Sequence, residues 1–156
     1  MSIKDLISTN RIICNVEVSS KKRALEVVSD LFGREVRDLS AHKIFESLIN
    51  RERLGSTGLG NGVCIPHARI EGIDQACGVL AKLKEGIDFG AVDNEPVDIM
   101  FALLVPEHYT DEHLQILAEL AELFSDLSIC EAIRESSSAE PMYQILSKWS
   151  ESNTDE

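Results

Sequence analysis

The stretch VDIMFALLV, residues 97–105, decides the fold class of this 156-residue chain. Apart from Asp98 it is a continuous apolar run, which is typical of a central β-strand covered on both faces. Three shorter strand candidates precede it, at residues 11–18, 63–65 and 78–83. The sheet therefore needs a cover of helices on each face.

Apolar residues at helical spacing predict such helices both before and after the strand region in the sequence. We expect a short opening helix over 3–8, a helix from Ser19 or Ser20 to Gly33, and another from Ser40 to about Leu54. The helical period returns in three segments after the central strand, at 110–124, 128–136 and 139–149. The pattern predicts an α/β fold with one domain over 1–149 and a flexible acidic tail over 150–156.

The net charge of the chain makes some classes of binding partner unfavourable. The chain has 15 basic and 27 acidic residues, a net charge of −12. Such an acidic protein is a poor partner for nucleic acid or for an anionic membrane. No apolar run is long enough to cross a bilayer and residues 1–10 contain no apolar signal core, so we expect a cytoplasmic protein without membrane insertion. Most of the excess acid lies in residues 106–156, which carry 2 basic and 12 acidic residues.

The segment GSTGLGNG, residues 55–62, predicts a loop that can bind an anion. Its glycines allow close backbone approach, so that amide N–H groups can share a concavity, and its hydroxyls add donors. It lacks the GK[ST] of a P-loop, and it follows a helix instead of a strand, so it is not a dinucleotide fingerprint. The substrate-binding candidates are Ser56, Thr57, Gly58, Gly60, Asn61 and Gly62. An ordinary turn is the alternative.

His67 is the candidate nucleophile, because it follows Pro66 at the end of a predicted strand. A neutral imidazole is a good nucleophile near pH 7, and it can accept a phosphoryl group on one nitrogen while a backbone carbonyl holds the other N–H. The alternative is a histidine that merely ends a strand.

His113 and Arg51 are the candidates for binding the anion. If Thr110 is the N-cap, His113 occupies the third helical position, where N–H groups and the helix dipole favour an anion. Asp111 and Glu112 beside it favour a protonated imidazole while the helix N-terminus opposes it, and this conflict stays open. Arg51 precedes the glycine loop, and a guanidinium can clamp a phosphate.

The four cysteines are scattered and predict reduced, core-filling residues. A zinc site built from Cys64, His67, His108 and His113 is an alternative, but structural zinc ligands normally come as two close pairs. We expect no metal and no cofactor. Cys64 lies three residues from His67, which also leaves a redox role open.

The segment 55–62 followed by IPH at 65–67 resembles the phosphorylation site of the mannitol/fructose-class enzyme IIA domains of the bacterial phosphoenolpyruvate-dependent phosphotransferase system. The supporting segments are SKKRALEVVSDLF, FESLINRERLGSTG, DNEPVDIMFALLVPE and HLQILAELAELF. Together they cover about residues 5–148. RERLGSTGLGNG and DNEPVDIMFALLVPE are most similar to the nitrogen-regulatory branch of that class.

The resemblance implies a mixed five-stranded sheet with helices on both faces. It also implies that His67 is phosphorylated on Nε2, that His113 stabilises the phosphoryl group, and that Arg51 is the active-site arginine. Cys64 and Ala68 stand where the family usually has alanine and glycine; both are small, so we expect no loss of function.

The implied partner is an HPr-like phosphocarrier that docks on a partly apolar patch including Leu59 and Val63. In the favoured hypothesis the phosphorylation state regulates target proteins of the sensor-kinase or potassium-transporter class. One alternative is a sugar-specific component that passes phosphate to a IIB domain for carbohydrate uptake. Another is a binding module of the same fold that is never phosphorylated.

Overall fold

The predicted central strand forms β6 (Val97–Pro106) in the computed structural model, which describes residues 2–152. β5 (Cys77–Ile87) lies antiparallel to it on one side. On the other side β3 (Val63–Cys64) and β4 (His67–Ile70) both pair parallel to β6, one after the other along its length. The predicted position of the 97–105 run at the centre of the sheet is confirmed.

Two outer strands complete a mixed sheet of six. β1 (Ile12–Val16) pairs parallel with β5, and β2 (Gly58–Gly60) pairs antiparallel with β3. The resemblance predicted about five strands. The structure therefore has one strand more than expected. Two short strands were not predicted from the sequence: β2 lies within the predicted glycine loop, and β4 begins two residues after the predicted strand at 63–65.

The five long helices of the described chain match the periodicity of the sequence. They are α1 (Lys21–Glu35), α2 (Ala41–Arg53), α3 (Asp111–Phe124), α4 (Leu127–Glu135) and α5 (Ala139–Ser152). Ser20 and Ser40 cap α1 and α2, because each side chain accepts a hydrogen bond from the backbone N–H three residues later. The predicted N-terminal boundaries of these two helices are therefore confirmed.

The predicted opening helix over 3–8 is wrong. Within this segment only the short 3₁₀ turn η1 (Ile3–Asp5) is helical, and a second 3₁₀ turn, η2 (Thr9–Arg11), follows Ser8. The Leu6 carbonyl accepts a 2.7 Å bond from Gly78 N–H and a bond from the guanidinium of Arg11. The bond from Gly78 attaches the N-terminal turn to the start of β5. Ser8 has an extended backbone, with φ −144° and ψ 162°, so a helix cannot continue through it.

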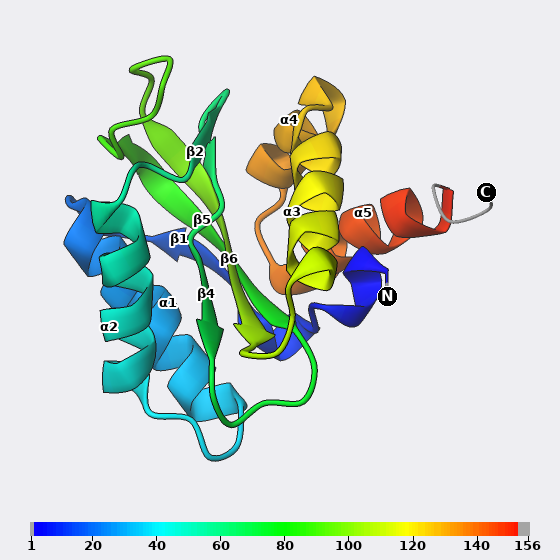
Figure 1. Cartoon of the computed structure of the whole chain (residues 1–156). Helices are drawn as coiled ribbons and strands as arrows, with labels where there is room; N and C mark the ends of the chain where they lie inside the picture. Colours follow the sequence, from blue (N-terminus) through cyan, green and yellow to red (C-terminus); the bar gives the residue numbers. More distant parts are fainter. Residues whose placement is uncertain (1, 153–156) are drawn as a thin grey trace.

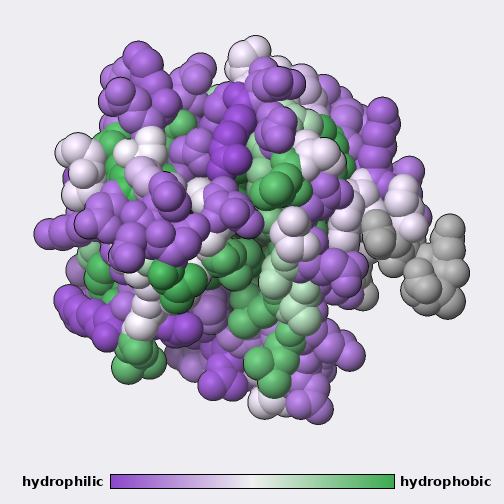
Figure 2. Space-filling view, turned by 90° about the horizontal axis from the view of Figure 1, so that it is seen from above, coloured by the Kyte–Doolittle hydropathy of each residue, from purple (hydrophilic) through white to green (hydrophobic). Residues whose placement is uncertain are grey.

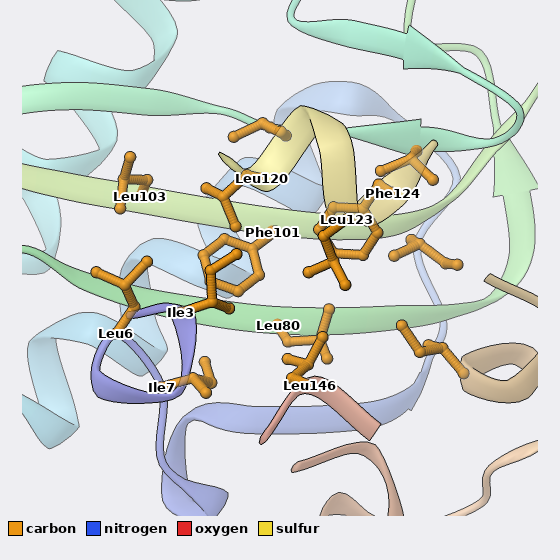
Figure 3. Packing of buried hydrophobic residues seen from close by; sticks show 14 of the residues in the cluster. Ile3, Leu6, Ile7, Leu80, Phe101, Leu103, Leu120, Leu123, Phe124 and Leu146 are labelled. Atoms are coloured by element: carbon orange, nitrogen blue, oxygen red, sulfur yellow. The ribbon is translucent and has the colours of Figure 1, made fainter. Parts of the chain in front are cut away.

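The helices form two layers around the sheet (Figure 1). α1 and α2 cover one face, and α3, α4 and α5 lie on the other together with the N-terminal turns. Figure 3 shows Phe101 of β6 among Ile3 and Leu6 on one side and residues of α3 on the other. Gly78 on β5 makes room for that ring, because a Cβ there would lie 2.6 Å from it. The predicted helices on both faces are confirmed.

The C-terminal helix runs beyond the predicted domain boundary at residue 149. α5 continues to Ser152, and Ser150, which was assigned to the flexible tail, is buried within it. The rest of the predicted tail, residues 153–156, lies outside the described residues. None of the helices in residues 2–152 has the length and apolar character needed to cross a membrane.

Candidate active site

A cleft of about 690 Å³ opens at the edge of the sheet where β4 passes between the end of α2 and the start of α3. The three elements can be followed in Figure 1. The lining of the cleft includes Arg51, His67 and His113, so the structure brings the three candidate catalytic residues together. The other lining residues are Ser47, Asn50, Leu54, Ala68, Arg69, Thr110, Asp111 and Leu114.

His67 is the first residue of β4, so its predicted place at the end of a strand is wrong. β3 and β4 act as one interrupted strand along β6, and the Pro66 carbonyl between them still accepts a 2.8 Å bond from Leu103 N–H. The imidazole Nδ1 lies 2.8 Å from the Ile65 carbonyl. A carbonyl can only accept, so Nδ1 carries the proton and Nε2 keeps its lone pair. Burial is the main cause that lowers the pKa of His67 and favours this neutral ring.

His113 lies at the third position of α3, after Thr110 as N-cap, as the sequence predicted. Its ring meets that of His67 edge to face, with centroids 5.3 Å apart. Burial, followed by the neighbouring His67, Arg69 and Arg51, lowers the pKa of His113 to about 4. The sequence left open whether His113 is protonated, and the lowered pKa favours the neutral ring. Burial and nearby cations outweigh the acidic neighbours.

The Nε2 atom of His113 is buried and has no hydrogen-bond partner in the described structure. Buried polar atoms nearly always have a partner, so one without a partner in a cleft is suited to a ligand. This atom is the clearest sign that the cleft is built to hold a polar group.

Arg51 comes from the last turn of α2. Its guanidinium donates a 2.9 Å bond to the Gly55 carbonyl and lines the cleft beside His67. Arg69 is a second cation there, and no functional role was assigned to it from the sequence. It lies two residues after His67 on β4, and the period of two in a strand places both side chains on the same face. That alternation is the signal that could have identified it.

The glycine segment is not part of the cleft lining. The Thr57 N–H is bonded to Glu52, the Gly58 N–H to the Ser56 hydroxyl, and the Asn61 N–H to Asp93. Ser56 Oγ donates to the Phe89 carbonyl, and Thr57 Oγ1 donates to Glu52. These three N–H groups and two hydroxyls are therefore bonded within the protein and are not free to join the predicted anion cradle.

The segment instead forms the β2–β3 hairpin. Asn61 and Gly62 turn the chain with φ values of 59° and 82°. Gly62 is also required by packing, because a Cβ there would collide with the guanidinium of Arg134. That guanidinium bonds the Asn61 carbonyl and pairs with Asp98 on β6. The hairpin turn and its Arg134 anchor therefore explain Gly62.

The predicted docking patch is also corrected. Val63 is fully buried, while Leu59 is 40% exposed. Figure 2 shows hydrophobic side chains gathered in patches on a largely hydrophilic face. Among residues 2–152 the exposed large hydrophobic side chains are Leu54, Leu59, Val92, Leu114 and Leu127. Leu54 and Leu114 line the cleft, so the apolar surface beside His67 comes from the ends of α2 and α3.

Cys64 is fully buried, and burial raises the pKa of its thiol well above the usual value. A protonated, inaccessible thiol is a poor redox sensor. Within residues 2–152 no group of three or more histidine, cysteine or acidic side chains is arranged to hold a metal ion.

Residues 5–149 match the family described as "Phosphoenolpyruvate-dependent sugar phosphotransferase system, EIIA 2". The chain belongs to this family. Within it, the chain is similar to the solved structure of the nitrogen regulatory protein IIA-Ntr from Neisseria meningitidis, with a TM-score of 0.87 and 46% identity over 92% of this chain and 98% of that one. The chain is thus an IIA-Ntr-like component of the phosphotransferase system.

Two curated relatives carry the same description. The nitrogen regulatory protein of Pseudomonas aeruginosa is 40% identical over 144 residues, which cover 92% of this chain and 94% of that protein. The nitrogen regulatory protein of Escherichia coli K12 is 44% identical over 132 residues, which cover 84% and 80%. The nitrogen-regulatory resemblance predicted from the sequence is confirmed at the level of the family branch.

Proposed function

We propose that this IIA-Ntr-like protein accepts a phosphoryl group on Nε2 of His67 from a histidine-phosphorylated, HPr-like carrier. The observation that carries the proposal is the bond between His67 Nδ1 and the Ile65 carbonyl. It leaves the Nε2 lone pair for attack, in a cleft that also contains two arginines and a second neutral histidine.

The transfer needs no metal ion and no proton shuttle. The Nε2 lone pair of His67 forms the new P–N bond while the P–N bond of the carrier breaks, and that electron pair returns to the carrier's ring. Each ring keeps the proton on its other nitrogen. Phosphorylated His67 is then cationic in its ring, and the Nδ1–H bond to the Ile65 carbonyl becomes charge-assisted and stronger.

The other side chains of the cleft stabilise the charge of the transferring group. Arg51 and Arg69 supply positive charge, and His113 Nε2 is a buried polar atom without a partner. A neutral His113 with its proton on Nε2 can donate to a phosphoryl oxygen. Catalysis here consists of positioning and electrostatic stabilisation, as is general for phosphoryl transfer.

The output that we favour is regulatory. The relatives at 40% and 44% identity are described as nitrogen regulatory proteins, which supports a role of the same kind. Phosphorylation adds about −1.5 to −2 charges to the cleft and so changes which surfaces can bind there. We propose cytoplasmic targets of the sensor-kinase or potassium-transporter class that distinguish the two states.

Phosphorylation of the purified chain tests the proposal. The protein is incubated with radiolabelled phosphoenolpyruvate, enzyme I and either a nitrogen-branch or a sugar-branch carrier, and acid-labile phosphate on the chain is measured. We expect labelling of the wild type and of the His108→Ala control, and none of His67→Ala. Labelling of His67→Ala at the wild-type rate, or no labelling by either carrier, would refute the proposed acceptor and favour a binding module.

The same assay separates the two outputs. Faster labelling from the nitrogen-branch carrier supports the regulatory role. Faster labelling from the sugar-branch carrier, followed by passage of the label to a IIB domain, would assign the protein to carbohydrate uptake and leave the role of His67 unchanged.

A further inference from the structure

Glu52 is a buried charged residue that has no part in the proposed chemistry. It follows Arg51 on α2, but its side chain is only 2% exposed and turns into the protein. The carboxylate accepts a 3.0 Å bond from Thr57 N–H and a second bond from Thr57 Oγ1. Burial of a carboxylate costs desolvation free energy, so we expect the buried Glu52 to have a role in the structure.

Lys21 at the start of α1 balances that charge. Its Nζ lies 2.9 Å from Glu52 Oε2, donates to the Phe89 carbonyl, and sits 4.6 Å from the centre of the Phe89 ring. The lysine therefore has several partners, and the carboxylate is fixed between α1 and the segment after α2. A buried ion pair contributes little net stability but can specify one arrangement of the groups bonded to it.

Thr57 passes this constraint on to the active site. Its carbonyl accepts a 3.0 Å bond from Ile65 N–H, and the Ile65 carbonyl in turn accepts the Nδ1–H of His67. Ile65 is thus held through its N–H on one side and bound to the imidazole on the other. Lys21, Glu52, Thr57, Ile65 and His67 form one continuous line of contacts, which we call the positioning network.

We propose that Glu52 is a positioning residue: through Thr57 and Ile65 it fixes the carbonyl that keeps the proton of His67 on Nδ1. The consequence for phosphoryl transfer rests on the proposed function, whereas the position of the ring proton does not. Glu52 never touches the reacting atoms.

The reason lies in the two tautomers of a neutral imidazole. One nitrogen is a donor and the other an acceptor, and the hydrogen bond made by one decides the state of the other. A displaced Ile65 carbonyl would release Nδ1, and part of the population would then carry its proton on Nε2. Those molecules would have no lone pair on Nε2.

Side-chain ¹⁵N NMR of His67, recorded at a pH where the ring is neutral, tests the positioning network directly. We expect the wild type to show the Nδ1–H form alone. Glu52→Gln and Thr57→Val should show a measurable fraction of the Nε2–H form. Thr57→Ser keeps the hydroxyl and should restore the wild-type spectrum.

A control separates positioning from loss of stability. Leu146 is fully buried on α5, and it belongs neither to the positioning network nor to the cleft lining. Leu146→Ala should lower the unfolding temperature and leave the His67 tautomer unchanged. If Glu52→Gln fails to fold, Thr57→Val decides alone, because it keeps the backbone bonds of residue 57. A wild-type tautomer in every folded variant of the network overturns the proposal.

Phosphorylation rates supply the second measurement. The labelling rate should scale with the fraction of molecules that keep the proton on Nδ1, so Glu52→Gln should label more slowly than wild type by the factor that its tautomer ratio gives. If wild type itself takes no phosphate on His67, the proposed function fails while the tautomer result still stands. An altered tautomer with an unchanged labelling rate would contradict the claim that Glu52 positions His67 for transfer.

Discussion

The rings of His67 and His113 meet edge to face, with centroids 5.3 Å apart and planes inclined by 78°. Each ring comes from a different layer of the site, one from β4 and one from the start of α3. Burial is the largest cause that lowers the pKa of each. Near neutral pH the pair therefore offers nitrogen donors and acceptors, while the fixed positive charge of the cleft comes from its arginines.

The first prediction concerns the titration of His113. NMR titration of its side-chain ¹⁵N signals should give a midpoint of about 4, below the usual value of 6.5. A phosphoryl group bound nearby favours the cation, so the midpoint should rise when His67 is phosphorylated. A midpoint at or above 6.5 in the unphosphorylated protein would contradict a buried, neutral ring.

The same shift predicts a pH dependence of stability. Between pH 6.5 and about 4 the unfolded chain binds a proton at His113 that the folded chain does not, so the free energy of unfolding falls as the pH is lowered. This contribution is fully present above pH 6.5 and is lost as the pH falls through that window. Urea unfolding should therefore show a shallower pH dependence for His113→Asn than for wild type. Parallel curves for the two proteins would exclude the effect.

The next prediction concerns Arg51. Its planar guanidinium lies beside His67 and is held by the Gly55 carbonyl. Lysine keeps the charge but lacks the fork of donors, so Arg51→Lys should slow phosphorylation by about tenfold or more, as expected for loss of a hydrogen bond to a charged group. Arg53→Lys is the matched control: Arg53 is exposed and outside the cleft lining. Equal rates for the two variants would remove Arg51 from the phosphate site.

The regular elements were predictable because their signals are local. The run at 97–105 needs nothing beyond its own apolar residues to indicate a covered strand, and Ser20 and Ser40 mark helix starts by their own hydroxyls. β2 and β4 were missed because each is too short to show a period, and β4 exists by pairing with β6, more than 30 residues later.

The site was predictable only in part, because some of its contacts join residues that are far apart in the sequence. The three candidate catalytic residues could be named from their types, their places in the chain and the family resemblance, and the structure brings them to one cleft. The glycine segment suggested an anion cradle because spacing does not reveal which N–H groups are already bonded. Nothing in the sequence indicates that Glu52 is buried, since its partner Lys21 lies 31 positions earlier.

Two buried serines on opposite faces of the sheet give a paired stability prediction. Ser150 Oγ is buried in α5 and has no hydrogen-bond partner within residues 2–152, whereas Ser29 Oγ donates to the Leu25 carbonyl. Removing an unpaired buried hydroxyl relieves a desolvation cost, so Ser150→Ala should raise the free energy of unfolding by about 1 kcal/mol. Ser29→Ala should lower it by about the same amount. Urea unfolding measures both, and destabilisation by Ser150→Ala would mean that the hydroxyl has a partner.

The last prediction concerns how the proposed carrier docks. Leu114 follows His113 on α3, is 66% exposed and lines the cleft, so a carrier that brings its histidine to His67 must cover it. Truncation of a leucine that the partner covers loses buried apolar area, worth roughly 25 cal/mol per Å². Leu114→Ala should therefore raise the KM for the phosphorylated carrier by about fivefold and leave both the unfolding temperature and the rate at saturating carrier near wild type. Leu127→Ala provides the control, because Leu127 is 56% exposed on α4 but lies outside the cleft lining. Equal KM values for wild type and both variants would place the docking surface elsewhere.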